Sequence, residues 1–84
     1  HASTVSREYE APQGEIEHKL AAVWQSLLKL EQVGRYDNFF ELGGHSLLVV
    51  SLIEQLRQQG LSIDVSAVFA APTLASMSTR LSQN

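Results

Sequence analysis

A chain of 84 residues can hold one small domain and leaves no room for a large enzyme scaffold. The absence of cysteine excludes disulfides and thiolate metal sites, and a formal net charge of −3 without a basic stripe argues against nucleic-acid binding. No apolar run approaches the length that spans a bilayer, so we expect a soluble protein without membrane contact. The lack of cysteine suits a reducing compartment, so we expect the protein in the cytoplasm.

The first 13 residues are polar and show no hydrophobic period, so we expect an extended leader or linker in which only Tyr9 could dock. Residues 1–3 are interpreted as a remnant of recombinant expression. The domain itself is expected to occupy residues 14–84.

Apolar residues then recur at the spacing of one helical face: Ile16, Leu20, Val23, Trp24, Leu27 and Leu28. Polar side chains, Glu17 and His18 among them, fall on the opposite side and predict a solvated face. We therefore predict a helix over residues 15–30. Glu15 in its first turn and Lys29 in its last turn match the helix dipole.

Residues 31–45 contain turn-forming residues and no sustained period, which predicts a long loop. Loops of this length in compact domains are usually functional or disordered, and the aromatic content argues against disorder. The aromatic side chains of this loop, together with Trp24, are assigned to the core: Tyr36, Phe39 and Phe40.

The next predicted helix runs over residues 46–59 and ends at Gly60, which suits a left-handed C-terminal position. On its helical wheel one side gathers the residues expected in the core: Val49, Leu52, Ile53 and Leu56. Leu47 and Val50 fall away from that side, so we expect both to be exposed next to Ser46.

Residues 61–64 form a connector without a partner strand, followed by a short helix over 65–71 capped by Asp64 or Ser66. Thr73 is predicted to cap a last helix whose apolar face comprises Leu74, Met77 and Leu81. The predicted fold is all-α: a four-helix bundle with three main helices, one short helix, a long first loop and no sheet.

Ser46 is the candidate functional residue. A serine at this position is most simply explained as an N-cap, but Val49 three residues later excludes a reciprocal capping box. The preceding Gly43, Gly44 and His45 are more than a cap requires, and glycines permit close approach by another molecule. Unpaired N–H groups at a helix start can also hold a phosphate.

A catalytic role for Ser46, with His45 as its base, is not supported. Adjacent helical residues do not face each other, and the sequence lacks the second glycine of the G-x-S-x-G motif. The three histidines show no metal-ligand spacing, and Glu41 near His45 is too weak a cluster. We expect neither catalysis nor a bound metal.

The run DNFFELGGHSL from Asp37 to Leu47 resembles the D-x-F-F-x-L-G-G-[HD]-S-[LI] signature of peptidyl carrier proteins, the thiolation domains of nonribosomal peptide synthetases. Residues 9–12 resemble the linker that follows an adenylation domain. Residues 20–24 resemble the first helix of the family, and residues 68–74 its third helix and the entry to its fourth. The resemblance covers residues 9–82 and implies a four-helix bundle.

By this resemblance Ser46 would receive 4′-phosphopantetheine from coenzyme A, transferred by a separate magnesium-dependent phosphopantetheinyl transferase. The terminal thiol would carry aminoacyl or peptidyl thioesters between adenylation, condensation and thioesterase or tailoring domains. Gly44 and His45 would present the group, His45 being usual in elongation carriers rather than those preceding epimerisation. The expected docking residues are Leu42, Gly43, Leu47 and Val50. The excised domain is expected to be a monomer.

Two alternatives stay open at this point. An acyl carrier of a polyketide or fatty-acid system shares the serine at a helix start, although such domains typically have aspartate before the serine. A helical adaptor without a prosthetic group would use Ser46 only as a cap.

Overall fold

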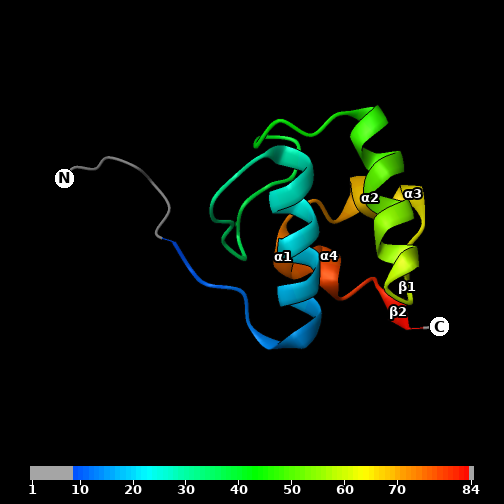
Figure 1. Cartoon of the computed structure of the whole chain (residues 1–84), viewed down its shortest axis with the longest axis horizontal. Coiled ribbons are helices and arrows are strands. Elements are labelled where there is room, and N and C mark those ends of the chain that lie inside the picture. Colours follow the sequence, from blue (N-terminus) through cyan, green and yellow to red (C-terminus); the bar gives the residue numbers. More distant parts are fainter. Residues whose placement is uncertain (1–8, 84) are drawn as a thin grey trace.

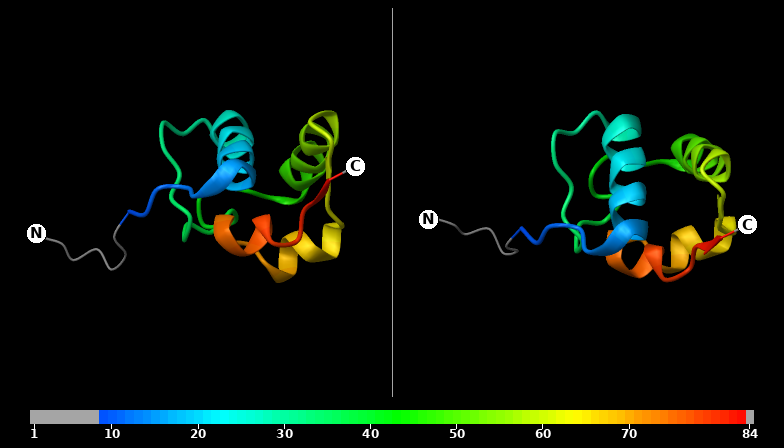
Figure 2. Two further views of the ribbon diagram at one scale, coloured as in Figure 1. Left: turned by 90° about the horizontal axis from the view of Figure 1, so that it is seen from below. Right: turned by 60° about the horizontal axis from the view of Figure 1, so that its bottom comes forward.

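The computed structural model describes residues 9–83. The first eight residues of the expected leader, including the remnant proposed at 1–3, lie outside the described residues. The helices are α1 (Gly14–Leu28), α2 (Ser46–Gln58), α3 (Val65–Ala70) and α4 (Leu74–Ser78). Helix α1 packs against α2 and α4, and α2 packs against α3. Figures 1 and 2 show α3 and α4 along one side of the α1–α2 pair.

The expected helical bundle with a long first loop is confirmed. The four helices are found as predicted, but the last of them, α4, is shorter than the main helix that was expected and contains five residues. Leu81, expected on its face, lies beyond the end of α4 and packs half-buried against the core. The cap of α4 is as predicted: the Thr73 hydroxyl accepts a hydrogen bond from Ser76 N at 3.3 Å.

Helix α1 ends two residues earlier than predicted. Lys29 is its C-cap in the left-handed region, with φ of 60°, and is therefore outside the last turn. Leu30 N donates to Gln25 O at 3.1 Å, which closes the helix end while the Leu30 side chain packs back against the core. Gly60 follows α2 with φ of +82°, as predicted for the residue that ends this helix.

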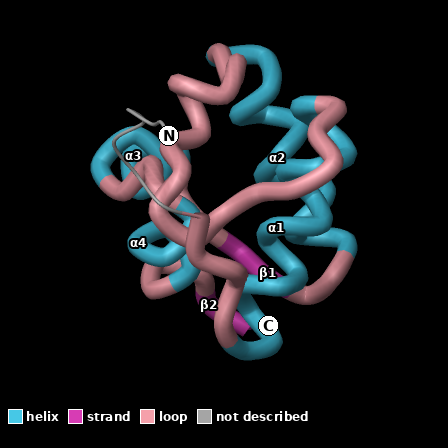
Figure 3. The backbone as a smooth tube through the Cα atoms, turned by 90° about the vertical axis from the view of Figure 1, so that its left-hand side faces the viewer, coloured by secondary structure: helices cyan, strands magenta, loops and turns pink. Residues whose placement is uncertain are grey.

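The prediction of no sheet is wrong. Strand β1 (Leu61–Ser62) pairs antiparallel with β2 (Ser82–Gln83), as Figure 3 shows. The partner strand was missed because it lies 20 residues away and has no alternating pattern that would mark it. Asp64 occupies the N-cap of α3 without a side-chain cap hydrogen bond, so neither sequence candidate is seen to cap this helix.

The core lies between the helices and the first loop. Trp24 and Phe39 are fully buried, with ring centroids 5.2 Å apart. Three of the four core positions predicted for α2 are buried: Val49, Leu52 and Leu56. Ile53 and Phe40 are only half-buried against the core. Tyr36 was wrongly assigned to the core: it is 46% exposed, and its hydroxyl accepts a hydrogen bond from Arg35.

Candidate functional site

A compact turn over residues 38–44 delivers the chain to Ser46. The Asn38 carboxamide accepts hydrogen bonds from Phe40 N (2.8 Å) and Glu41 N (3.2 Å). Gly43 N donates to Phe40 O at 3.2 Å, and Gly44 N donates to Phe39 O at 2.9 Å. The turn is therefore held by its own backbone and by one asparagine side chain.

Glycine is required at positions 43 and 44 for two different physical reasons. Gly43 has φ of +115°, a conformation that residues with a side chain rarely adopt, and the space around it is open. At Gly44 a Cβ atom would overlap the ring of Phe39 and lie 2.8 Å from Phe39 O. Phe39 is fully buried and its N–H donates to Pro72 O at 2.9 Å, so the turn packs on a residue of the core.

Ser46 is the first residue of α2 and is exposed. His45 occupies the N-cap position, without a side-chain cap hydrogen bond. The interpretation of Ser46 as an N-cap is therefore wrong. No hydrogen bond of its hydroxyl is found among residues 9–83, so that hydroxyl is available to another molecule.

The start of α2 suits an anion. The bond from Val49 N to His45 O (3.0 Å) is the first of the helix, so the N–H groups of residues 46–48 are not used by the helical ladder. No acidic residue lies in the first turn. A phosphate bound to Ser46 would therefore meet the positive end of the helix dipole without a carboxylate to repel it.

Exposed apolar side chains follow Ser46 on α2. Leu47 is 75% exposed and Val50 is 63% exposed, as the wheel predicted. Leu42 is half-buried and packs against the core, which leaves only part of its side chain accessible. Sequence reasoning missed Val65 and Phe69 on α3, each 51% exposed; the Phe69 ring stacks on Phe40 at 5.0 Å.

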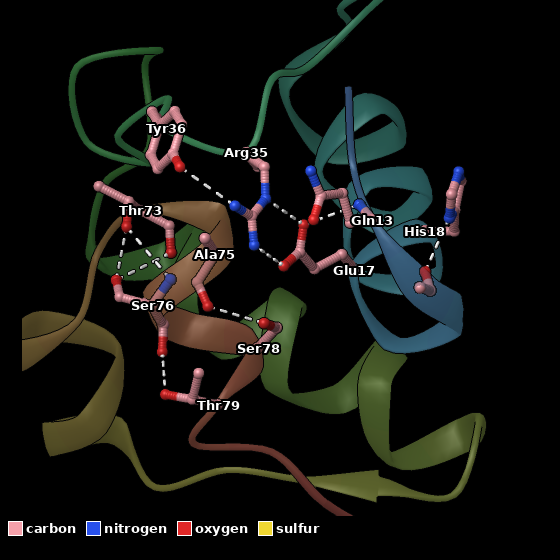
Figure 4. A network of polar contacts seen from close by, with 11 residues as sticks. Gln13, Glu17, His18, Arg35, Tyr36, Thr73, Ala75, Ser76, Ser78 and Thr79 are labelled. Atoms are coloured by element: carbon pink, nitrogen blue, oxygen red, sulfur yellow. Dashed lines mark hydrogen bonds and ion pairs between the residues drawn. The ribbon is translucent and has the colours of Figure 1, made fainter. Parts of the chain in front are cut away.

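A buried ion pair behind the loop was also missed. Glu17, predicted on a solvated face, is buried, and its carboxylate accepts hydrogen bonds from Arg35 Nε (3.0 Å) and Nη2 (2.7 Å), as Figure 4 shows. The sequence contained a signal: Glu17 precedes Leu20, Ala21 and Trp24 by three, four and seven residues, which places it on the apolar face. A carboxylate there requires a cationic partner.

This pair changes the ionisation of both groups. The Arg35 guanidinium holds the pKa of the Glu17 carboxyl below its usual range, because its hydrogen bonds outweigh the opposing effect of burial. The pKa of Arg35 is raised for the same reason. Both groups are therefore charged at neutral pH, and α1 is tied to the first loop.

Comparison with known proteins identifies the family. The family described as the phosphopantetheine attachment site matches residues 18–81. Malpibaldin synthetase of Mortierella alpina is 57% identical over 77 residues, covering 92% of this chain and 1% of that protein. Tyrocidine synthase 3 of Brevibacillus parabrevis is 44% identical over 77 residues, covering 90% of this chain and 1% of that protein. The chain thus spans only about 1% of the length of these curated relatives.

Solved structures of carrier domains match the fold of this chain. A nonribosomal PCP domain superposes with a TM-score of 0.83 and 34% identity, covering 88% of this chain and 96% of that chain. The structure of the phosphopantetheine transferase Sfp in complex with coenzyme A and a peptidyl carrier protein matches with a TM-score of 0.80 and 32% identity, covering 84% of this chain and 94% of that chain. The chain therefore belongs to the phosphopantetheine-attachment family and is a peptidyl carrier domain of the nonribosomal peptide synthetase kind, with 4′-phosphopantetheine as its prosthetic group.

Proposed function

We propose that Ser46 is the attachment point, primed from coenzyme A by a separate phosphopantetheinyl transferase. The primed domain then carries aminoacyl or peptidyl thioesters between the catalytic domains of a larger synthetase. One observation carries this proposal: the Ser46 hydroxyl is exposed and unbonded at the start of α2, next to a glycine turn anchored on buried Phe39.

The residues present fit the prosthetic group. Gly43 has open space where a side chain would stand, and Ser46 and His45 are exposed, so an incoming phosphate meets no obstruction from these side chains. The unused N–H groups at the start of α2 would hold its charge. When attached, the group supplies a thiol at the end of a flexible tether, which raises its effective concentration at each partner.

We propose that the chain does not activate its own serine. Within residues 9–83 no side chain is hydrogen-bonded to the Ser46 hydroxyl, and His45 next to it makes no cap contact. No group of three metal-ligating side chains is found in the same range. We propose that the transferase removes the proton of Ser46 and that the domain acts as a carrier rather than as a catalyst.

Leu47 and Val50 are proposed to dock partners. They lie three residues apart on α2 and share one face, and both are more than half exposed. A domain that meets several partners in turn needs a small apolar contact that also releases. Gly43 and the accessible part of Leu42 precede Ser46 in the chain and are proposed to complete this contact surface.

The proposed partners are the transferase and the adenylation, condensation and thioesterase or tailoring domains of a synthetase. Support comes from the similarity to the nonribosomal PCP domain and to the solved complex of Sfp with a peptidyl carrier protein. The same two structures favour peptide synthesis over a polyketide or fatty-acid system. None of the helices in the described range has the length and apolarity of a membrane crossing.

Incubation with coenzyme A, magnesium and a broad-specificity phosphopantetheinyl transferase, followed by intact mass measurement, tests the proposal. We expect the wild-type chain to gain the mass of one phosphopantetheinyl group and Ser46→Ala to gain none. Ser66→Ala is the matched control, because Ser66 is also an exposed serine in the first turn of a helix. An unmodified wild type, or a modified Ser46→Ala, would contradict the proposal.

A further inference from the structure

Residues 9–13 pack on the domain and are called the strap here. Arg35 N donates to Glu10 O at 2.8 Å, and on its other side Arg35 O accepts from Ala75 N at 2.8 Å. The first loop is therefore the middle of three adjacent segments, with the strap on one side and the start of α4 on the other. The linker predicted to be merely extended is hydrogen-bonded to the loop that leads to Ser46.

Gly34 is the contact point of the strap. A Cβ atom at this position would lie 3.1 Å from Glu10 O and 3.1 Å from the ring of Tyr9. Gly34 is not among the glycines with positive φ, so its small size matters rather than its backbone freedom. An open cavity of about 320 Å³ continues the contact between Tyr9 and Pro12 of the strap and His18 of α1.

The far end of the strap is fixed to α1 by the same ion pair that holds the loop. Gln13 N donates to Glu17 Oε1 at 2.9 Å, and Glu17 receives the two hydrogen bonds of Arg35 (Figure 4). One buried carboxylate thus joins strap, helix and loop.

A continuous series of contacts leads from the strap to the serine. Arg35 N donates a hydrogen bond to Glu10 O. Two residues later, Asp37 O accepts a hydrogen bond from Leu74 N at 3.2 Å. Phe39 N then donates to Pro72 O, and Phe39 supports Gly44 through the 2.9 Å bond to Gly44 N. Ser46 follows two residues later. The strap and Ser46 therefore lie at the two ends of one series of backbone hydrogen bonds.

We propose that the strap is a positioning element through which the preceding part of the chain controls the presentation of Ser46. With Tyr9 and Glu10 seated on Gly34 and Arg35, the loop is held and Ser46 is offered to partners. When the preceding chain draws them away, the loop loosens and fewer molecules are in the binding-competent form. This inference rests on the proposed function, because priming of Ser46 is one of its readouts.

The test compares the full wild-type chain with Gly34→Val and Tyr9→Ala. The valine side chain is expected to push the strap away, and the alanine removes the aromatic ring that lies against Gly34. With coenzyme A and the transferase, we expect the KM for the carrier to rise about threefold to tenfold, the range that packed networks transmit, with unchanged kcat. Amide exchange at Gly44 should accelerate by a similar factor, and exchange at Leu56 in α2 should stay unchanged.

Tyr9→Phe is the matched control, because it keeps the ring that contacts Gly34 and should behave as wild type. Unchanged KM and Gly44 exchange in both variants would overturn the proposal. Equal acceleration at Gly44 and Leu56 would also overturn it, since that reports global destabilisation. If Gly34→Val fails to fold, the KM and the Gly44 exchange of Tyr9→Ala decide whether the proposal holds. If the wild type is not primed, the proposed function fails, while Gly44 exchange still tests the strap.

Discussion

At the scale of single residues, the site depends on how tightly Gly44 meets Phe39. Phe39 is fully buried against Trp24, and its ring and carbonyl occupy the space where any larger residue at position 44 would place its Cβ. The glycine is needed for close packing, whereas Gly43 beside it is needed for its positive φ. Two adjacent glycines therefore do different work in presenting Ser46.

Gly44→Ala should lower the free energy of unfolding by about 2–3 kcal/mol, because a packed core resists an added methyl group. Gly34→Ala is a graded control: its Cβ would meet neighbours at 3.1 Å, which a small shift relieves, so its loss should stay below about 1 kcal/mol. Urea unfolding monitored by Trp24 fluorescence measures both. Equal midpoints for Gly44→Ala and wild type would show that the turn can move away from Phe39.

At the scale of elements, α2 has a different function on each of two faces. One face packs Val49, Leu52 and Leu56 into the core, and the other exposes Leu47 and Val50 beside Ser46. The helix is held from inside, so its outer face can change without loss of the fold. The first loop is held in the same way, by the Glu17–Arg35 pair on one side and by the start of α4 on the other.

Leu47→Asp and Val50→Asp should slow priming by the transferase severalfold, because a charge replaces apolar contact area. Their unfolding free energies should change by less than about 0.5 kcal/mol, as is usual at exposed sites. Leu52→Ala on the same helix is the contrasting control and should lose about 2–5 kcal/mol, because Leu52 is fully buried. A large stability loss in Leu47→Asp would place this residue in the core and refute the docking role.

The Glu17–Arg35 pair predicts a pH dependence. A carboxyl whose pKa is lower in the folded state contributes stability above its unfolded pKa and loses it as pH falls through the folded pKa. The wild type should therefore lose stability on acidification below the ordinary glutamate range, and Glu17→Gln should lack this part of the loss. At neutral pH we expect the variant to be less stable by about 1–3 kcal/mol.

Urea unfolding at pH 7 and pH 3 measures this difference. The gap between wild type and Glu17→Gln should be smaller at pH 3, because pH 3 lies below the ordinary glutamate range, where the stability contributed by the Glu17 carboxylate is being lost. Glu15→Gln is the control: Glu15 is exposed on the same helix and pairs with Lys19 at 3.4 Å, so its removal should change the stability little. An equal gap at both pH values would show that charge is not what Glu17 contributes.

At the scale of the whole molecule, local sequence patterns predicted the features that depend on neighbouring residues. The apolar period placed α1 and α2, and Gly60 and Thr73 marked element ends correctly, because these depend on neighbouring residues. The position of Ser46 at a helix start, and the exposure of Leu47 beside it, followed from the same period.

Features that depend on distant residues were not predicted. The β1–β2 pair joins segments 20 residues apart, and Glu17 meets Arg35 across 18 residues, so neither partner is visible in a local window. Tyr36 was assigned to the core by its type, yet its ring lies beneath the Arg35 guanidinium at 5.3 Å and stays exposed. The contact of the strap with the loop was hidden for the same reason.

Localisation of the prosthetic group tests the central claim most directly. Trypsin cuts after Arg35 and Arg57, so the primed chain should yield the peptide from Tyr36 to Arg57, which contains two serines, Ser46 and Ser51. Tandem mass spectrometry of this peptide distinguishes them. We predict that the phosphopantetheinyl group is found on Ser46, the exposed residue, and not on half-buried Ser51. A group on Ser51, or on a peptide outside residues 36–57, would contradict the assignment of Ser46.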